Sequence, residues 1–207
     1  SSDISKTIRA DYGADRFYAE LATKAIKGWH QWNEESGQTL YEETGNLWLT
    51  PHPMTEGQFE FESCRVLSEL NYPTEPLEKS EIQKRFPAWK EAGYAHGYYN
   101  PRGGWAKSTR TVAWLLEKAT EEGVILRQNN GMTELLEHAG QVDGIITQDG
   151  TEHRSDLVII ATGAWTPRLL PWMVRILKSV AQPVYHFQLA DPTAYQGTQF
   201  PQWGANV

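Results

Sequence analysis

The sequence predicts an α/β unit in the middle of the chain, between flanking segments that mix helices and strands. The first indication is a helix over residues 108–122 followed directly by the strand "VILRQ", which together form the second half of a βαβ-type unit. The second is the run from Leu157 to Ala161, which has no polar face and is typical of a strand covered on both sides in a parallel sheet. Three segments follow: mixed α+β structure over 1–100, α/β structure over 101–172, and β structure again over 173–207.

Residues 1–100 alternate between helical and strand signals. Apolar residues recur at three- and four-residue spacing from Ala14 to Asn33, which predicts an amphipathic helix. The other elements expected here are a strand over 45–50, a helix over 55–70, a short helix over 79–86 stopped by Pro87, and a strand over 96–101.

The rest of the chain shows a capped helix and a hairpin. Ser108 is placed to cap the helix that runs to about Glu122. The apolar side of that helix comprises Val112, Leu115, Leu116 and Ala119. Asp149-Gly150 lies between two short alternating segments, which strongly indicates a β-hairpin. The later stretch "QPVYHFQLAD" alternates like a strand of a different sheet.

The composition of the chain favours a globular protein and argues against nucleic-acid-binding and membrane-spanning classes. The chain has 207 residues, 40% of them hydrophobic, which is enough for a globular fold with a substantial core. A net charge of -7 with scattered Lys and Arg argues against a nucleic-acid surface, and no apolar stretch approaches the ~20 residues that span a bilayer. The single cysteine, Cys64, fits a reducing compartment, so we expect an intracellular protein, cytoplasmic or peroxisomal, with a packed thiol.

The six histidines show no spacing typical of metal ligands, so no metal site is expected. His186 lies in the alternating stretch near the end of the chain and is interpreted as a packed or hydrogen-bonded residue.

Small residues follow the apolar run at residues 157–160. Ala161, Thr162 and Gly163 stand where the strand ends, and ligands of open parallel sheets bind beyond the carboxyl ends of strands. Small side chains there let the backbone approach a cofactor closely. The same residues also suit an ordinary turn between a strand and a loop, and both interpretations stay open at this point.

Three stretches together carry a family resemblance: "SSDISKTIRADYG", "GYYNPRGGWAKSTRTVAWLLEKATEEGV" and "DLVIIATGAWTPRLLP". In this order they resemble the FAD-dependent amine oxidases of the D-amino-acid-oxidase superfamily, a group that includes sarcosine, L-pipecolate and fructosyl amino acid oxidases. The resemblance implies part of an FAD-binding sheet of the glutathione-reductase-like Rossmann type, plus a substrate domain with a mixed or antiparallel sheet. It covers the middle of such an enzyme, because family members begin with a strand and G-x-G-x-x-G, and no two glycines here are separated by a single residue.

The resemblance also implies a cofactor site. Ala161, Thr162 and Gly163 would contact FAD through their backbone. The backbone amide and carbonyl of Met132, in "NNGMTELL", would hold the adenine, although a methionine by type alone is more often a core residue.

Lys6 and Arg9 are the expected catalytic and substrate-binding residues. They are three positions apart, which on a helical turn places both cations on one face, and by type alone they would be a solvated surface pair. By resemblance, Lys6 matches an arginine beside the flavin in sarcosine oxidase and a lysine in fructosyl amino acid oxidases. Arg9 matches the arginine that binds the substrate carboxylate.

The function implied by the resemblance is FAD-dependent oxidation of a secondary amine of an amino acid, namely sarcosine, pipecolate or a related N-substituted amino acid, with oxygen as acceptor and hydrogen peroxide as product. The alternatives are a fructosyl amino acid oxidase, or a non-catalytic fragment that acts as a binding module. The oxygen-activating lysine of the family has no match here, and Lys178 is expected at the surface. We expect the 207-residue polypeptide to purify without flavin, to be inactive alone, and to associate with itself or with complementary segments.

Overall fold

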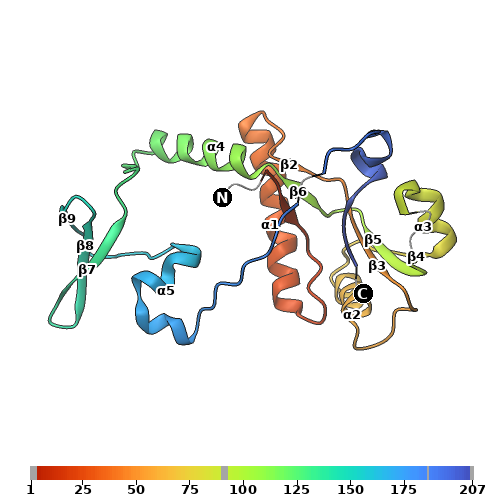
Figure 1. The fold of residues 1–207 in the computed structure, drawn as a ribbon, viewed down its shortest axis with the longest axis horizontal. Helices are drawn as coiled ribbons and strands as arrows, with labels where there is room; N and C mark the ends of the chain where they lie inside the picture. The colour runs from red at the N-terminus through yellow and green to blue at the C-terminus, as the bar shows by residue number, and fades with distance from the viewer. Residues whose placement is uncertain (1–3, 90–92, 186, 206–207) are drawn as a thin grey trace. The chain divides into compact units, whose positions relative to one another are not determined.

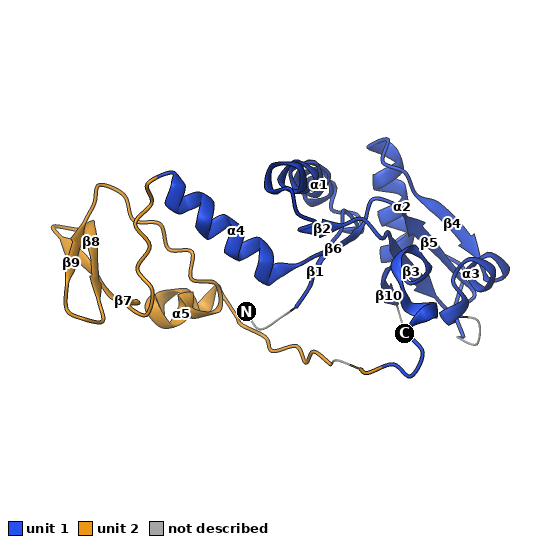
Figure 2. Ribbon diagram, turned by 90° about the horizontal axis from the view of Figure 1, so that it is seen from above, with its two compact units in different colours: residues 1–122, 189–207 blue, residues 123–188 orange. Residues whose placement is uncertain are grey.

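The computed structural model describes residues 4–89, 93–185 and 187–205. They form two compact units, which Figure 2 shows in different colours: residues 1–122 with 189–207, and residues 123–188. The first unit contains β1 (Lys6–Ile8), α1 (Arg16–Ser36), β2 (Tyr41–Glu42), β3 (Asn46–Thr50), α2 (Phe59–Glu69), β4 (Glu75–Glu78), α3 (Lys79–Arg85), β5 (His96–Asn100), β6 (Gly104–Ala106), α4 (Ser108–Glu121) and β10 (Gln202–Ala205). The second contains β7 (Met132–His138), β8 (Gln141–Thr147), β9 (Glu152–Arg154) and α5 (Thr166–Leu169).

The first unit is built on two sheets, ordered β1-β6-β2 and β10-β3-β5-β4. Figure 1 labels β2 and β6 of the first sheet and β3, β4 and β5 of the second. In the larger sheet β3 pairs antiparallel with β5 and parallel with β10. Its core side chains are apolar and aromatic: Leu47, Leu49, Leu77, Ile82, Phe86, Trp89 and Tyr99. A second core cluster, Ala10, Ile26, Tyr41 and Leu67, joins α1, α2 and the segment after β1. These cores confirm the helical spacing over 14–33 and the apolar strand over 45–50.

The helix α4 begins where the sequence predicts, with one correction at its start. Lys107 occupies the N-cap and Ser108 is the first helical residue, so the expected cap is wrong by one position. Trp114 is buried and lies 5.7 Å from the ring of Trp32 on α1. The expected apolar side, by contrast, is exposed at Val112, Leu115 and Leu116. Among the described residues, α4 is therefore covered only on its tryptophan face.

The second unit contains the expected hairpin. The strands β8 and β9 pair antiparallel, and Gly150 at the turn has φ +79° and donates its amide to the carbonyl of Thr147 at 2.8 Å. β7 adds a third strand on the other side of β8.

Three other expected strands of the chain are not formed. Residues 124–128 and 157–161 have no regular secondary structure, and neither do the described parts of 182–191; His186 lies outside the described residues. Leu157 and Ile159 are 71% and 79% exposed. A strand requires a hydrogen-bonding neighbour, and no described strand lies beside these runs, so their apolar pattern alone does not make them strands.

No helix in the described part of the chain is long and apolar enough to cross a membrane.

Alanine substitutions at two glycines of the first unit should change the free energy of unfolding in opposite directions. A Cβ at Gly97, in the central strand β5, would lie 2.1 Å from the carbonyl oxygen of Trp48, whereas a Cβ at Gly28, inside α1, would meet nothing within 4 Å. We expect Gly97→Ala to lower the free energy of unfolding by about 3 kcal/mol. Gly28→Ala should raise it by roughly 0.5–1 kcal/mol, because alanine favours the helix. Urea unfolding followed by tryptophan fluorescence checks both; equal effects of the two variants would contradict this packing of β5 against β3.

Candidate functional site

Arg9 lies just after β1, among aromatic rings. Its guanidinium carbon is 4.9 Å from the ring centroid of Tyr12, 5.2 Å from that of Trp48 and 5.7 Å from that of Phe59. The expected helical turn is wrong, because Lys6 to Ile8 form a strand paired with β6. Lys6 is exposed on that strand, while Arg9 is half-buried. The aromatic rings hold the guanidinium as a planar cation, and within the described part of the chain only one of its five N–H donors has a partner.

A buried carboxylate fixes the backbone next to Arg9. The guanidinium donates a hydrogen bond to the backbone carbonyl of Asp11. The Asp11 side chain is fully buried and accepts from the Tyr98 hydroxyl at 2.6 Å and from the amides of Asn46 and Asn100 at 3.0 Å each. Burial raises the pKa of Asp11, and the three hydrogen bonds oppose that rise. Asp11 therefore ties the chain that carries Arg9 to strands β3 and β5.

Arg9 opens into a small cavity of about 200 Å³. Its walls are formed by Arg9, Trp48, Phe59, Glu60 and Ala205. We call it the Arg9 cavity. The lining residues that the structure describes belong to the first unit. Trp48 comes from β3, Phe59 and Glu60 come from the start of α2, and Ala205 comes from β10. The cavity thus combines one cation, one acid and apolar walls, which suits a small ligand that carries a carboxylate for Arg9 together with apolar groups.

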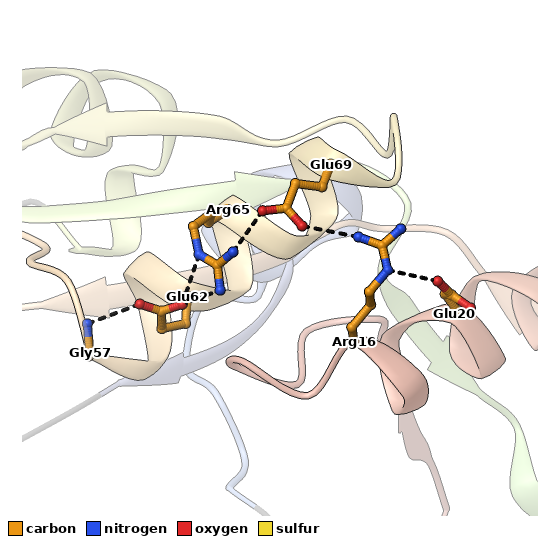
Figure 3. Close-up of polar contacts among 6 residues, drawn as sticks. All are labelled: Arg16, Glu20, Gly57, Glu62, Arg65 and Glu69. Atoms are coloured by element: carbon orange, nitrogen blue, oxygen red, sulfur yellow. Dashed lines mark hydrogen bonds and ion pairs between the residues drawn. The ribbon is translucent and has the colours of Figure 1, made fainter.

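A series of ion pairs holds α2, and with it one wall of the cavity, against α1 (Figure 3). Arg65 pairs with Glu62 at 2.7 Å and with Glu69 at 2.6 Å, and Glu69 in turn pairs with Arg16 of α1 at 3.0 Å. The amide of Gly57 donates to Glu62 at 3.0 Å, and this bond, followed by Arg65, lowers the pKa of Glu62. The start of α2 is therefore fixed by partners outside the cavity.

The expected cofactor residues lie in the second unit. Met132 is the first residue of β7, pairs with Thr147 and is half-buried. Ala161 and Gly163 are exposed; Gly163 has φ +52°, and a Cβ there would meet nothing within 4 Å. The positive φ suits glycine, and the space beside this turn is open.

Outside the Arg9 cavity, the described cysteine, Cys64, and the described lysine at position 178 are not placed for catalysis. Burial raises the pKa of the Cys64 thiol to about 12, which agrees with an unreactive, packed cysteine. Lys178 is exposed, as expected. No group of three His, Cys, Asp or Glu residues that could hold a metal ion occurs within the described ranges.

Comparison with known proteins identifies the class of protein that carries this fold. Residues 1–204 match the model of the family described as FAD dependent oxidoreductase. The chain belongs to this family, and the resemblance drawn from its three stretches is confirmed.

Similar proteins agree with the family. The chain is 25% identical over 197 residues to N-methyl-L-tryptophan oxidase of Yersinia pestis (strain Pestoides F), covering 95% of this chain and 51% of that protein. The same figures apply to N-methyl-L-tryptophan oxidase of Yersinia pseudotuberculosis (serotype O:1b, strain IP 31758). The chain thus spans about half the length of the curated relatives it matches.

Solved structures confirm the predicted α/β fold class. L-proline dehydrogenase from P. horikoshii matches with a TM-score of 0.71 at 21% identity, over 84% of this chain and 45% of that one. NikD, an unusual amino acid oxidase essential for nikkomycin biosynthesis, matches with a TM-score of 0.66 at 24% identity. The match covers 84% of this chain and 44% of NikD. A modified fructosyl peptide oxidase from Aspergillus nidulans matches with a TM-score of 0.64 at 22% identity. The match covers 80% of this chain and 40% of that one.

Sequence reasoning did not find five polar residues around Arg9. They are Asp11, Asn46, Tyr98, Asn100 and Glu60. A signal was present for two of them, because each asparagine stands at one end of a strand and next to apolar or aromatic residues, in "NLWLT" and "HGYYN". Such residues in a buried strand need a polar partner.

Proposed function

We propose that this chain supplies the substrate-carboxylate site and the adenine-side segments of an FAD-dependent oxidase acting on a secondary amine of an amino acid. The observation that carries the proposal is the Arg9 guanidinium, held by aromatic rings and by the Asp11 carbonyl at the mouth of a small cavity. A planar guanidinium can donate two parallel hydrogen bonds to a carboxylate and remains charged in a dry site. Family membership and the N-methyl amino acid oxidases among the relatives support the same substrate class.

In this proposal the protein binds and orients while the flavin reacts. FAD, when bound, accepts a hydride equivalent from the carbon next to the amine and passes the electrons to oxygen. Arg9 would hold the substrate carboxylate, and Trp48 and Phe59 would exclude water around it. Lys6 would place a positive charge beside the flavin ring, where negative charge develops on reduction. The amine would enter as the neutral base, because the ammonium has no lone pair to release.

Four residues of the second unit would hold the cofactor. Ala161, Thr162 and Gly163 would contact FAD through the exposed turn, and the Met132 backbone would contact the adenine. The family implies FAD for its members, and these assignments extend it to particular residues of this chain. We further propose an intracellular setting, cytoplasmic or peroxisomal, on the ground of the single cysteine.

Two alternatives have an observation each in their favour. A fructosyl amino acid oxidase is favoured by the lysine at position 6 and by the similarity to a fructosyl peptide oxidase. A binding module that associates with complementary segments or with itself is favoured by the exposed apolar residues of α4.

A ligand titration separates these proposals. Trp48 lines the cavity, so binding of N-methylglycine, pipecolate or a fructosyl amino acid should change the tryptophan fluorescence of the chain. We expect the secondary amino acids to bind more tightly than the fructosyl compound. Tighter binding of the fructosyl compound would favour the first alternative. A chain that binds none of these ligands yet sediments as an oligomer would favour the second.

A further inference from the structure

Glu60 is a buried acid that faces the Arg9 cavity and has no hydrogen-bond or ion-pair partner among the residues that the structure describes. It is the second residue of α2, is 2% exposed and forms part of the cavity wall together with Arg9. No hydrogen bond or ion pair joins its carboxylate to any residue that the structure describes. The cavity therefore has a cation and an unpaired acid in the same wall.

Neighbouring acids show how unusual this is. Asp11, equally buried, accepts three hydrogen bonds, and Glu62, in the same turn of α2, accepts from Gly57 and pairs with Arg65. The side chain of Glu60 is almost wholly enclosed and its carboxylate reaches solvent only through the cavity, so little water compensates its charge, and the first turn of a helix offsets only part of that cost. The carboxylate of Glu60 is thus available for a group that enters the cavity.

The chemistry of that group follows from the rest of the cavity. A ligand carboxylate held by Arg9 would be repelled by Glu60, whereas a cation on the same ligand would be attracted. The cation is not the reacting amine, because a carboxylate beside that amine would favour its ammonium form and oppose oxidation. A second nitrogen, on the side chain of the substrate, meets both requirements.

We infer that Glu60 selects amino acids with a basic side chain, an assignment that rests on the proposed role of Arg9 as the carboxylate site. Arg9 binds the substrate carboxylate and Glu60 binds the side-chain ammonium. The reacting amine then has no carboxylate of Glu60 beside it. Simple apolar N-methyl amino acids fit the same cavity but leave Glu60 without a partner.

Matched ligand pairs test this inference by direct binding, without turnover. Each pair differs only in a terminal ammonium or methyl group: Nα-methyl derivatives of 2,4-diaminobutyrate and norvaline, of ornithine and norleucine, and of lysine and 2-aminoheptanoate. Dissociation constants are measured by calorimetry on the full 207-residue chain, its Glu60→Gln variant and its Glu56→Gln variant. Glu56 is exposed and outside the cavity, so Glu56→Gln is the matched control for the loss of one acid.

We expect the best diamino ligand to bind wild type at least about tenfold more tightly than its apolar partner. In Glu60→Gln this preference should fall below about threefold, while Glu56→Gln should keep it. Thermal unfolding of each variant shows that the fold is retained.

The other possible results contradict either the Glu60 assignment alone or the proposed function as well, and the measurements tell these two cases apart. If wild type binds both members of every pair equally and Arg9→Ala abolishes that binding, the assignment of Glu60 is wrong and the carboxylate site stands. A preference that survives in Glu60→Gln overturns the assignment as well. If wild type binds no member of any pair, the proposed function fails and the assignment fails with it.

Discussion

Arg9→Ala should weaken the binding of N-substituted amino acids to the chain by about 2–5 kcal/mol, roughly thirtyfold or more in affinity. The reason is that, among the described residues, the guanidinium is the only cation lining the Arg9 cavity, so its loss leaves the ligand carboxylate without a charged partner from that set. Isothermal titration with N-methylglycine measures the change.

Arg85 offers a matched control for this variant. Its guanidinium also packs on aromatic rings, 4.2 Å from the centroid of Tyr99 and 5.4 Å from that of Phe86, but it lies outside the Arg9 cavity. Arg85→Ala should leave ligand affinity unchanged, whatever it does to stability. An unchanged affinity in Arg9→Ala would remove Arg9 from the substrate site.

Asp11→Ala should lower the free energy of unfolding by about 3–5 kcal/mol, because it leaves the donors of Tyr98, Asn46 and Asn100 buried and unsatisfied at once. Asp191→Ala is the control: Asp191 is exposed and, of the described residues, only Thr193 donates to it, so its loss should stay within about 0.5 kcal/mol. Chemical denaturation compares the two variants. Similar losses would mean that the Asp11 hydrogen bonds do not hold β3 and β5 to the segment that carries Arg9.

Asp11 also predicts a pH dependence of definite sign. Burial raises its pKa in the folded state above the ordinary value, so the folded protein binds the proton more tightly than the unfolded chain. Its contribution to stability is therefore greatest at low pH and falls as pH rises from about 4 through the raised pKa. The difference in unfolding free energy between wild type and Asp11→Asn should decrease over that window and stay constant outside it. An increase instead would show that the hydrogen bonds outweigh desolvation.

Helices were predictable because their signal is local. The spacing over 14–33 and 108–122 places apolar side chains on one face regardless of what they pack against, and α1 and α4 form within a few residues of those limits. The run from Leu157 to Ala161 shows the opposite case. A strand in a parallel sheet depends on neighbours elsewhere in the chain, and the described residues provide none beside it.

The candidate site divides in the same way. A family motif predicts Arg9 as a site residue, but the sequence does not predict its polar neighbours, because these residues come together only in the folded chain. Asn46, Asn100 and Tyr98 come from β3 and β5, and Glu60 from α2, so no spacing along the sequence links them to Arg9. Lys6 was placed on a helical turn because a short motif cannot distinguish a helix from an edge strand.

The parallel pairing of β10 with β3 has a consequence for the order of folding. Gly204 lies against Trp48 so closely that a Cβ would be 2.6 Å from the indole, and Ala205 lies opposite Leu49 at the cavity wall. These contacts join residues that are separated along the chain by the whole second unit, a pairing of high contact order. On a ribosome, β3, β5 and α2 emerge long before β10, so the nascent chain must carry an unfinished sheet edge and an open cavity through the synthesis of residues 123–188. Competence to bind a ligand through Arg9 would then arise late, as a single event, when β10 adds to the sheet.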